Sequence, residues 1–202
     1  MYKYILPLLL LACTNENVLP ESNNGEVDSN SVPGLSEGYP TFRVVVDENL
    51  NDYFKALVRE SLKDWSNSTR CMNWFVEYKS INIKDIYNQM KLNLSSDSYT
   101  IYFMGGSVYD YPNKAAGTEW IGQGHFYTQN NHVNHRGFAF IDSHIMDGGT
   151  DRTVRHELGH AMGMNHNETN RYAIMKPGYD SDNLHVLQVA DVWQFRDYWN
   201  CK

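Results

Sequence analysis

The sequence predicts an α+β fold, and three observations support this class. A β-branched run at residues 41–47 is typical of a strand, and residues 50–65 then have the apolar spacing of an amphipathic helix. Several extended runs follow in the middle of the chain, and two helical patterns occupy its C-terminal third. The chain thus begins with a strand and a helix, continues with several strands and ends with two helices. This order is typical of α+β domains.

Each element has its own pattern. The first helix has apolar side chains at helical spacing: Leu50, Phe54, Leu57, Val58, Leu62 and Trp65. Strands are predicted at residues 41–47, 74–78, 99–104, 120–128 and 137–142. A helix is expected to begin at residue 151 or 152, and a last helix to span about residues 187–199. Residues 80–98 are ambiguous.

Length and composition restrict the class of protein. A chain of 202 residues suits one well-buried domain, and 42% hydrophobic with 13% aromatic residues predicts that it folds. The net charge is -7, and Lys and Arg form no basic stripe. Because nucleic-acid binders need such a stripe, we exclude a nucleic-acid partner. We also expect a monomer.

The first residues, 1–12, have the pattern of a targeting segment. Lys3 gives a positive start, residues 5–11 are apolar, and Ala12 precedes Cys13. The segment is too short to span a bilayer, which takes about 20 apolar residues. It resembles a bacterial lipoprotein signal peptide, which implies cleavage before Cys13 and lipid attachment there. An ordinary secretory signal is the alternative, so we expect a lipid-anchored protein of the bacterial cell envelope or a secreted one.

A polar segment follows the targeting segment, and export affects how the two other cysteines are interpreted. Residues 13–40 are rich in Asn, Ser, Glu, Gly and Pro, which predicts a flexible tether before a folded domain at 41–202. In an oxidising compartment, Cys71 and Cys201 could form a disulfide. Two buried free thiols fit the sequence equally well, because it does not place their Cα atoms.

A histidine motif points to a metal site. Side chains four residues apart share one face of a helix, so His156 and His160 can bind one ion. Gly163 can take a positive φ angle and turn the chain so that His166 supplies a third imidazole. Three protein ligands leave one position for water, as in catalytic zinc sites. Glu157 would then activate the metal-bound water for peptide hydrolysis.

This motif resembles that of the metzincin clan of zinc peptidases, and residues 173–179, AIMKPGY, resemble the methionine turn of its matrixin members. The resemblance implies a zincin-type domain: a mixed twisted sheet, an active-site helix, a methionine turn and a C-terminal helix. It places Met175 beneath the zinc ligands. It also implies that Pro177 and Tyr179 wall the pocket for the side chain after the scissile bond, which favours an apolar residue there. Calcium is not supported, because the family's calcium loops have no convincing counterpart.

These patterns predict a zinc-dependent endopeptidase that acts on proteins or peptides. One alternative is a catalytically silent zinc-binding domain of the envelope, and another is a maturation protease for a single partner. Glu157 favours an enzyme, because a silent domain has no physical need for that carboxylate.

Two further points stay open in the sequence. His132 and His135 lie in an Asn-rich loop and are expected to be exposed, and a second metal site that uses His125 or His135 is the minor alternative. Residues 120–128 could form an edge strand that pairs with a substrate backbone, or an ordinary strand of the sheet.

Overall fold

The computed structural model describes residues 28–30, 39–91, 99–107, 122–127, 135–144, 149–178 and 185–201. In chain order its elements are β1 (Asp28–Asn30), β2 (Thr41–Asp47), α1 (Asp52–Thr69), β3 (Asn73–Lys79), α2 (Ile83–Lys91), β4 (Thr100–Gly106), β5 (Gly122–Tyr127), β6 (Arg136–Asp142), α3 (Thr150–Ala161) and α4 (Val189–Tyr198). The predicted strands and helices are confirmed within the described ranges, and the ambiguous stretch contains α2. Cys13 and Tyr179 lie outside these ranges.

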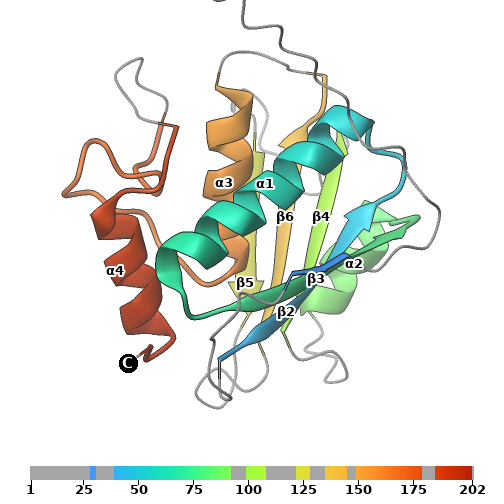
Figure 1. The fold of residues 1–202 in the computed structure, drawn as a ribbon. Coiled ribbons are helices and arrows are strands. Elements are labelled where there is room, and N and C mark those ends of the chain that lie inside the picture. Colours follow the sequence, from blue (N-terminus) through green and yellow to red (C-terminus); the bar gives the residue numbers. More distant parts are fainter. Residues whose placement is uncertain are drawn as a thin grey trace, which may run out of the picture.

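The strands form one mixed sheet with the order β1-β3-β2-β4-β6-β5. The four central strands are parallel to one another, whereas β1 and β5 run antiparallel to their neighbours at the two edges. Figure 1 shows α1 and α3 crossing this sheet, with α4 beside them. The expected mixed sheet is therefore present.

The two faces of the sheet have separate cores, because alternate side chains of a strand point to opposite faces. Ile101 and Phe103 of β4 belong to the large core that includes residues of α1, α3 and α4. Met104 of β4, with Phe138 and Phe140 of β6, packs against α2 instead. Right-handed crossovers explain this division, since the chain moves across the sheet in opposite directions from β2 to β3 and from β3 to β4.

Helix α1 has well-defined ends and fixes the position of α3. The Asn51 side chain caps it by accepting a hydrogen bond from the Phe54 backbone N–H at 3.0 Å. Arg70 ends it with a φ of 53°. Trp65, fully buried, donates from its indole Nε1 to the Arg155 carbonyl oxygen of α3 at 3.2 Å. The indole therefore satisfies its polar atom on the helix that carries the histidine motif.

Strand β1 lies within the segment predicted to be a tether. Asp28–Asn30 pair antiparallel with β3, and Ser29 lies opposite Phe75. The free edge of β3 offers backbone groups that an extended segment can pair with. A short polar segment can add a strand in this way without an apolar pattern of its own.

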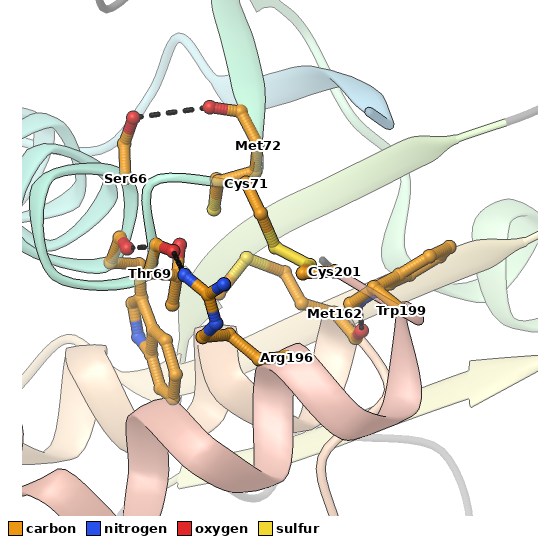
Figure 2. Close-up of a disulfide and its surroundings, with 9 residues drawn as sticks. Ser66, Thr69, Cys71, Met72, Met162, Arg196, Trp199 and Cys201 are labelled. Carbon is orange, nitrogen blue, oxygen red and sulfur yellow. Dashed lines mark hydrogen bonds between the residues drawn. A yellow bond between two sulfur atoms is a disulfide. The ribbon is translucent and has the colours of Figure 1, made fainter. Parts of the chain in front are cut away.

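A disulfide joins Cys71 to Cys201, which settles a point that the sequence left open. It ties the segment after α1 to the segment after α4, across 130 residues of chain. Figure 2 shows two hydrogen bonds beside it: Arg196 Nη1 donates to the Thr69 carbonyl oxygen at 2.9 Å, and Trp199 Nε1 donates to the Met162 carbonyl oxygen at 3.0 Å. The end of α4 is thus attached to both α1 and α3.

Glu77 of β3 provides a pH-dependent contribution to stability. Hydrogen bonds from Arg43, at 3.0 and 3.1 Å, and from Lys79 lower the pKa of Glu77 from 4.5 to about 2. Because the folded-state pKa is the lower one, the stabilisation is present above pH 4.5 and is lost as the pH falls towards 2.

We expect Glu77→Gln to lower the free energy of unfolding by roughly 1 kcal/mol at pH 7, an amount reduced by the partial exposure of the pair. The difference from wild type should disappear between pH 4.5 and 2. Urea unfolding across this pH range measures both effects, with the exposed Glu48→Gln as the control. A difference that persists at pH 2 would contradict the assignment.

Candidate metal centre

Helix α3 carries the histidine motif between the sheet and α1. It packs on β5 and β6 and against α1. The structure brings His156, His160 and His166 together, with one ring nitrogen of each within 4.8 Å of the others. His156 is buried, His160 is half-buried and His166 is exposed. The site is therefore open to solvent on the side of His166.

Two of these imidazoles are held in a defined tautomer. His156 Nδ1 donates to the Ile174 carbonyl oxygen at 2.6 Å, and His160 Nδ1 donates to the Met164 carbonyl oxygen at 2.7 Å. Because a carbonyl oxygen can only accept, the proton of each neutral ring lies on Nδ1. Both Nε2 atoms then present lone pairs, and they face each other at 3.1 Å.

This geometry fits a tetrahedral metal ion. Two facing lone pairs repel each other unless a cation lies between them. Nitrogen ligands of a tetrahedral zinc, each about 2.0–2.1 Å from the ion, lie about 3.3 Å apart. Carbonyl acceptors on the second ring nitrogen are the usual support for a metal-binding histidine. The donor set of His156, His160 and His166 therefore suits zinc.

Burial keeps the first two histidines neutral. Burial, with a smaller effect of the nearby His160 ring, lowers the pKa of His156 from 6.5 to about 3. It also lowers the pKa of His160 to about 4, with an additional effect of the His166 ring. A metal ligand must be unprotonated, so neither ring needs to lose a proton near neutral pH to bind an ion.

The end of α3 directs the chain towards the third histidine. Gly163 has a φ of 104°, a conformation that glycine adopts without strain. Its N–H donates to the His160 carbonyl oxygen, and the Met164 N–H donates to the Gly159 carbonyl oxygen, both at 2.9 Å. This bonding pattern ends a helix and reverses the chain. The predicted role of Gly163 as a turn agrees with this geometry.

Glu157 lies under the edge strand β5. Its side chain is buried, and a Cβ atom added to Gly122 would lie 2.7 Å from its carboxylate Oε1. Burial raises the pKa of Glu157 from 4.5 to about 8, although a hydrogen bond from the Gly124 backbone lowers it in part. A carboxylate with a pKa near neutrality can both accept and return a proton.

The turn that contains Met175 lies directly beneath α3. Met175 is fully buried, and its Sδ atom lies where a Cβ of Gly159 would be, so only glycine fits there. The Asn167 N–H donates to the Met175 carbonyl oxygen at 2.8 Å. Pro177 follows and is half-buried, whereas Tyr179 lies outside the described residues.

Two buried charged residues that the sequence did not single out hold this turn. Asp191 of α4 accepts the N–H groups of Ile174 at 2.9 Å, Met175 at 3.0 Å and Gln188 at 2.8 Å. Arg152 of α3 donates to the Ile174 carbonyl oxygen at 3.3 Å and to the Lys176 carbonyl oxygen at 2.9 Å. Gln188 and Asp191 also form a capping box, a spacing that could have identified Asp191 in the sequence.

Replacing Asp191 with alanine is expected to lower the free energy of unfolding by about 3 kcal/mol, because two buried N–H groups and one partly buried N–H group lose their acceptor. Asp197, exposed on the same helix, provides the matched control, and Asp197→Ala should change stability little. Urea unfolding of both variants measures the difference. Equal stability of the two would show that the turn does not depend on the Asp191 carboxylate.

The other histidines do not join this cluster in the described part of the chain. The expectation that His135 is exposed was wrong. It is fully buried before β6, its Nε2 lies 2.8 Å from the Ala161 carbonyl oxygen, and it stacks on Phe126. Aromatic neighbours from distant parts of the chain bury it, and an Asn-rich loop gives no sign of them. His125 is exposed on β5, and His132 lies outside the described residues.

Comparisons with known proteins identify the fold. No protein-family model and no curated protein matches the sequence. The structure is similar to archaemetzincin from Methanopyrus kandleri, with a TM-score of 0.54 and 10% identity over 80% of this chain and 96% of that one. It is also similar to metalloproteinase-II from Bacteroides fragilis, with a TM-score of 0.50 and 11% identity over 87% of this chain. The aligned part makes up 58% of that chain. The fold of this protein is therefore similar to that of archaemetzincin and of metalloproteinase-II.

Proposed function

We propose that the protein is a zinc-dependent endopeptidase. The observation that carries this proposal is the pair of facing Nε2 atoms of His156 and His160, 3.1 Å apart, on the helix that also carries the buried carboxylate of Glu157. A structural zinc site has four protein ligands, whereas the described residues supply three histidines here. The metallopeptidase fold supports the same reading.

The roles of the residues follow from their chemistry. His156, His160 and His166 would hold zinc, which when bound polarises a carbonyl and lowers the pKa of a water molecule. Glu157 accepts the proton of the attacking water and then delivers it to the leaving nitrogen of the peptide bond. Its burial beneath β5 keeps bulk water from competing for that proton. No covalent intermediate with the protein is needed.

Substrate contacts follow from the elements around Glu157. Strand β5 is an edge strand next to α3, so an extended substrate can pair with its free side. As the resemblance to matrixins implies, the turn with Met175 acts as a methionine turn. Pro177 and Tyr179 then wall the pocket for the residue after the scissile bond. We propose a preference for an apolar residue at that position.

We further propose that the protein acts as a monomer anchored to the bacterial envelope through a lipid on Cys13, with residues 1–12 removed. No helix in the described residues is both long and apolar enough to cross a membrane. Metabolic labelling with an alkyne fatty acid tests the anchor. Wild type should incorporate the label and Cys13→Ala should not; labelling of both would contradict attachment at Cys13.

A peptide-library digest combined with metal analysis tests the enzyme. We expect zinc to copurify, cleavage to stop on treatment with a chelator, and zinc to restore it. Sequencing of the products reports the residue after each cleaved bond. Zinc binding without any cleavage of peptides, casein or gelatin would reject the general endopeptidase in favour of a silent binding domain or a single-partner maturation protease.

A further inference from the structure

One face of α4 contacts the segment that follows the active-site helix. Asp191, Gln194 and Tyr198 are three and four residues apart, so they project from the same side of the helix. Asp191 binds the turn with Met175, and the Tyr198 ring lies against Gly163, where an added Cβ would overlap it. Helix α4 therefore follows the chain from the end of α3 to the methionine-containing turn.

Gln194 meets this segment next to the third histidine. Its Nε2 donates to the Asn165 carbonyl oxygen at 2.9 Å, one residue before His166. The other amide atom, Oε1, is buried. The half-buried side chain amide thus bridges α4 and the backbone that carries His166, with its hydrogen bond at the protein surface.

His166 depends on its backbone more than the other two histidines do. His156 and His160 sit on a helix, and each ring is fixed by an Nδ1–H bond to a carbonyl oxygen. Among the described residues no such bond is found for His166, which is exposed on a loop. Its position is set by the residues on either side: Asn165 is held by Gln194, and Asn167 by the Met175 carbonyl oxygen.

We propose that Gln194 is a positioning residue for the third metal ligand, His166. The inference rests on the proposed zinc site. Without the Gln194 bond, the loop is free to move at Asn165, and ordering it on metal binding costs conformational entropy. Loss of a group that supports a metal ligand typically weakens metal binding by about 10- to 100-fold.

The test compares two neighbouring residues of α4 in the full chain. Gln194→Met keeps the length of the side chain but removes the donor. Trp193→Ala is the matched control, because Trp193 is the neighbouring residue of the same helix and is 71% exposed. Zinc affinity is measured by competition with a chromophoric chelator, the release rate by chelator chase, and the stability of the metal-free protein by thermal unfolding.

We expect Gln194→Met to bind zinc about tenfold more weakly than wild type and to release it faster. The melting temperature of the metal-free protein should match that of Trp193→Ala, and excess zinc should restore peptide cleavage. Gln194→Asn, whose shorter side chain cannot reach Asn165, should bind zinc as weakly as Gln194→Met does. This variant replaces Gln194→Met in the experiment if the methionine variant does not fold.

Two outcomes separate the inference from the proposed function. Zinc affinity equal to wild type in the Gln194 variants would overturn the positioning role and leave the zinc site intact. Failure of the wild-type protein to bind zinc at all would reject the proposed function, and with it the inference.

Discussion

Replacing Glu157 with glutamine is expected to lower peptide hydrolysis by roughly 10²- to 10⁴-fold while zinc binding is retained. Glutamine has the shape of glutamate but cannot accept the proton of the attacking water. Glu157 is not one of the three residues whose nitrogens gather at the site, so the substitution leaves the three histidines in place. The measurement is kcat on a peptide identified in the digest, together with the zinc content of both proteins.

Glu168→Gln is the control for this experiment, because Glu168 is an exposed glutamate close in sequence to His166. It should cleave peptide as wild type does. Equal kcat for Glu157→Gln and wild type would reject the proton-transfer role. Loss of zinc together with activity would instead assign Glu157 a part in metal binding.

The features that the sequence predicted are local ones. Helical spacing alone places His156 and His160 on one face, and a glycine three residues after His160 predicts where the helix ends. Strands β2 and β6 are apolar enough to be recognised from their own residues. In each case the pattern that gives the prediction lies within about two turns or one strand.

The features that the sequence missed depend on distant contacts. Asp191 acts on a turn 16 and 17 residues away, and Arg152 reaches Ile174 across 22 residues. The Gln194 bond to Asn165 spans 29 residues. Strand β1 is polar and exists through its pairing with β3. Partners at such distances follow from the tertiary fold, so a single sequence gives no direct signal for them.

Two of the missed residues, Asp191 and Gln194, belong to one element, α4, which links the core to the site. Its Asp191 and Gln194 support the two loops after α3, and its C-terminal end is attached to α1 and to the end of α3. The helix was predicted from apolar spacing, yet its polar side chains make these contacts. The three clustered histidines on a helix and a loop are thus bordered by a helix that contributes no histidine to the cluster.

Removing the Cys71–Cys201 disulfide is expected to lower the free energy of unfolding by about 3 to 5 kcal/mol. The bond closes a loop over a sequence separation of 130 residues, so it restricts the unfolded chain strongly. Cys71 is fully buried, and the bond lies beside the Arg196 and Trp199 hydrogen bonds that attach α4 (Figure 2). The double variant Cys71→Ser and Cys201→Ser should unfold at a lower urea concentration than wild type.

A chain with Cys13→Ala is the reference for that comparison, because it retains the disulfide and removes the only other thiol. Reduction of the disulfide in the reference protein should reproduce the loss of stability. The reductant is a phosphine, because a thiol reductant would bind zinc. Asp191, which holds the turn with Met175, lies ten residues before Cys201 and so away from the removed bond in the sequence. We therefore expect the folded serine variant to keep part of its zinc affinity. Equal unfolding midpoints for the reference, the reduced protein and the serine variant would show that the hydrogen bonds of α4 suffice without the covalent link.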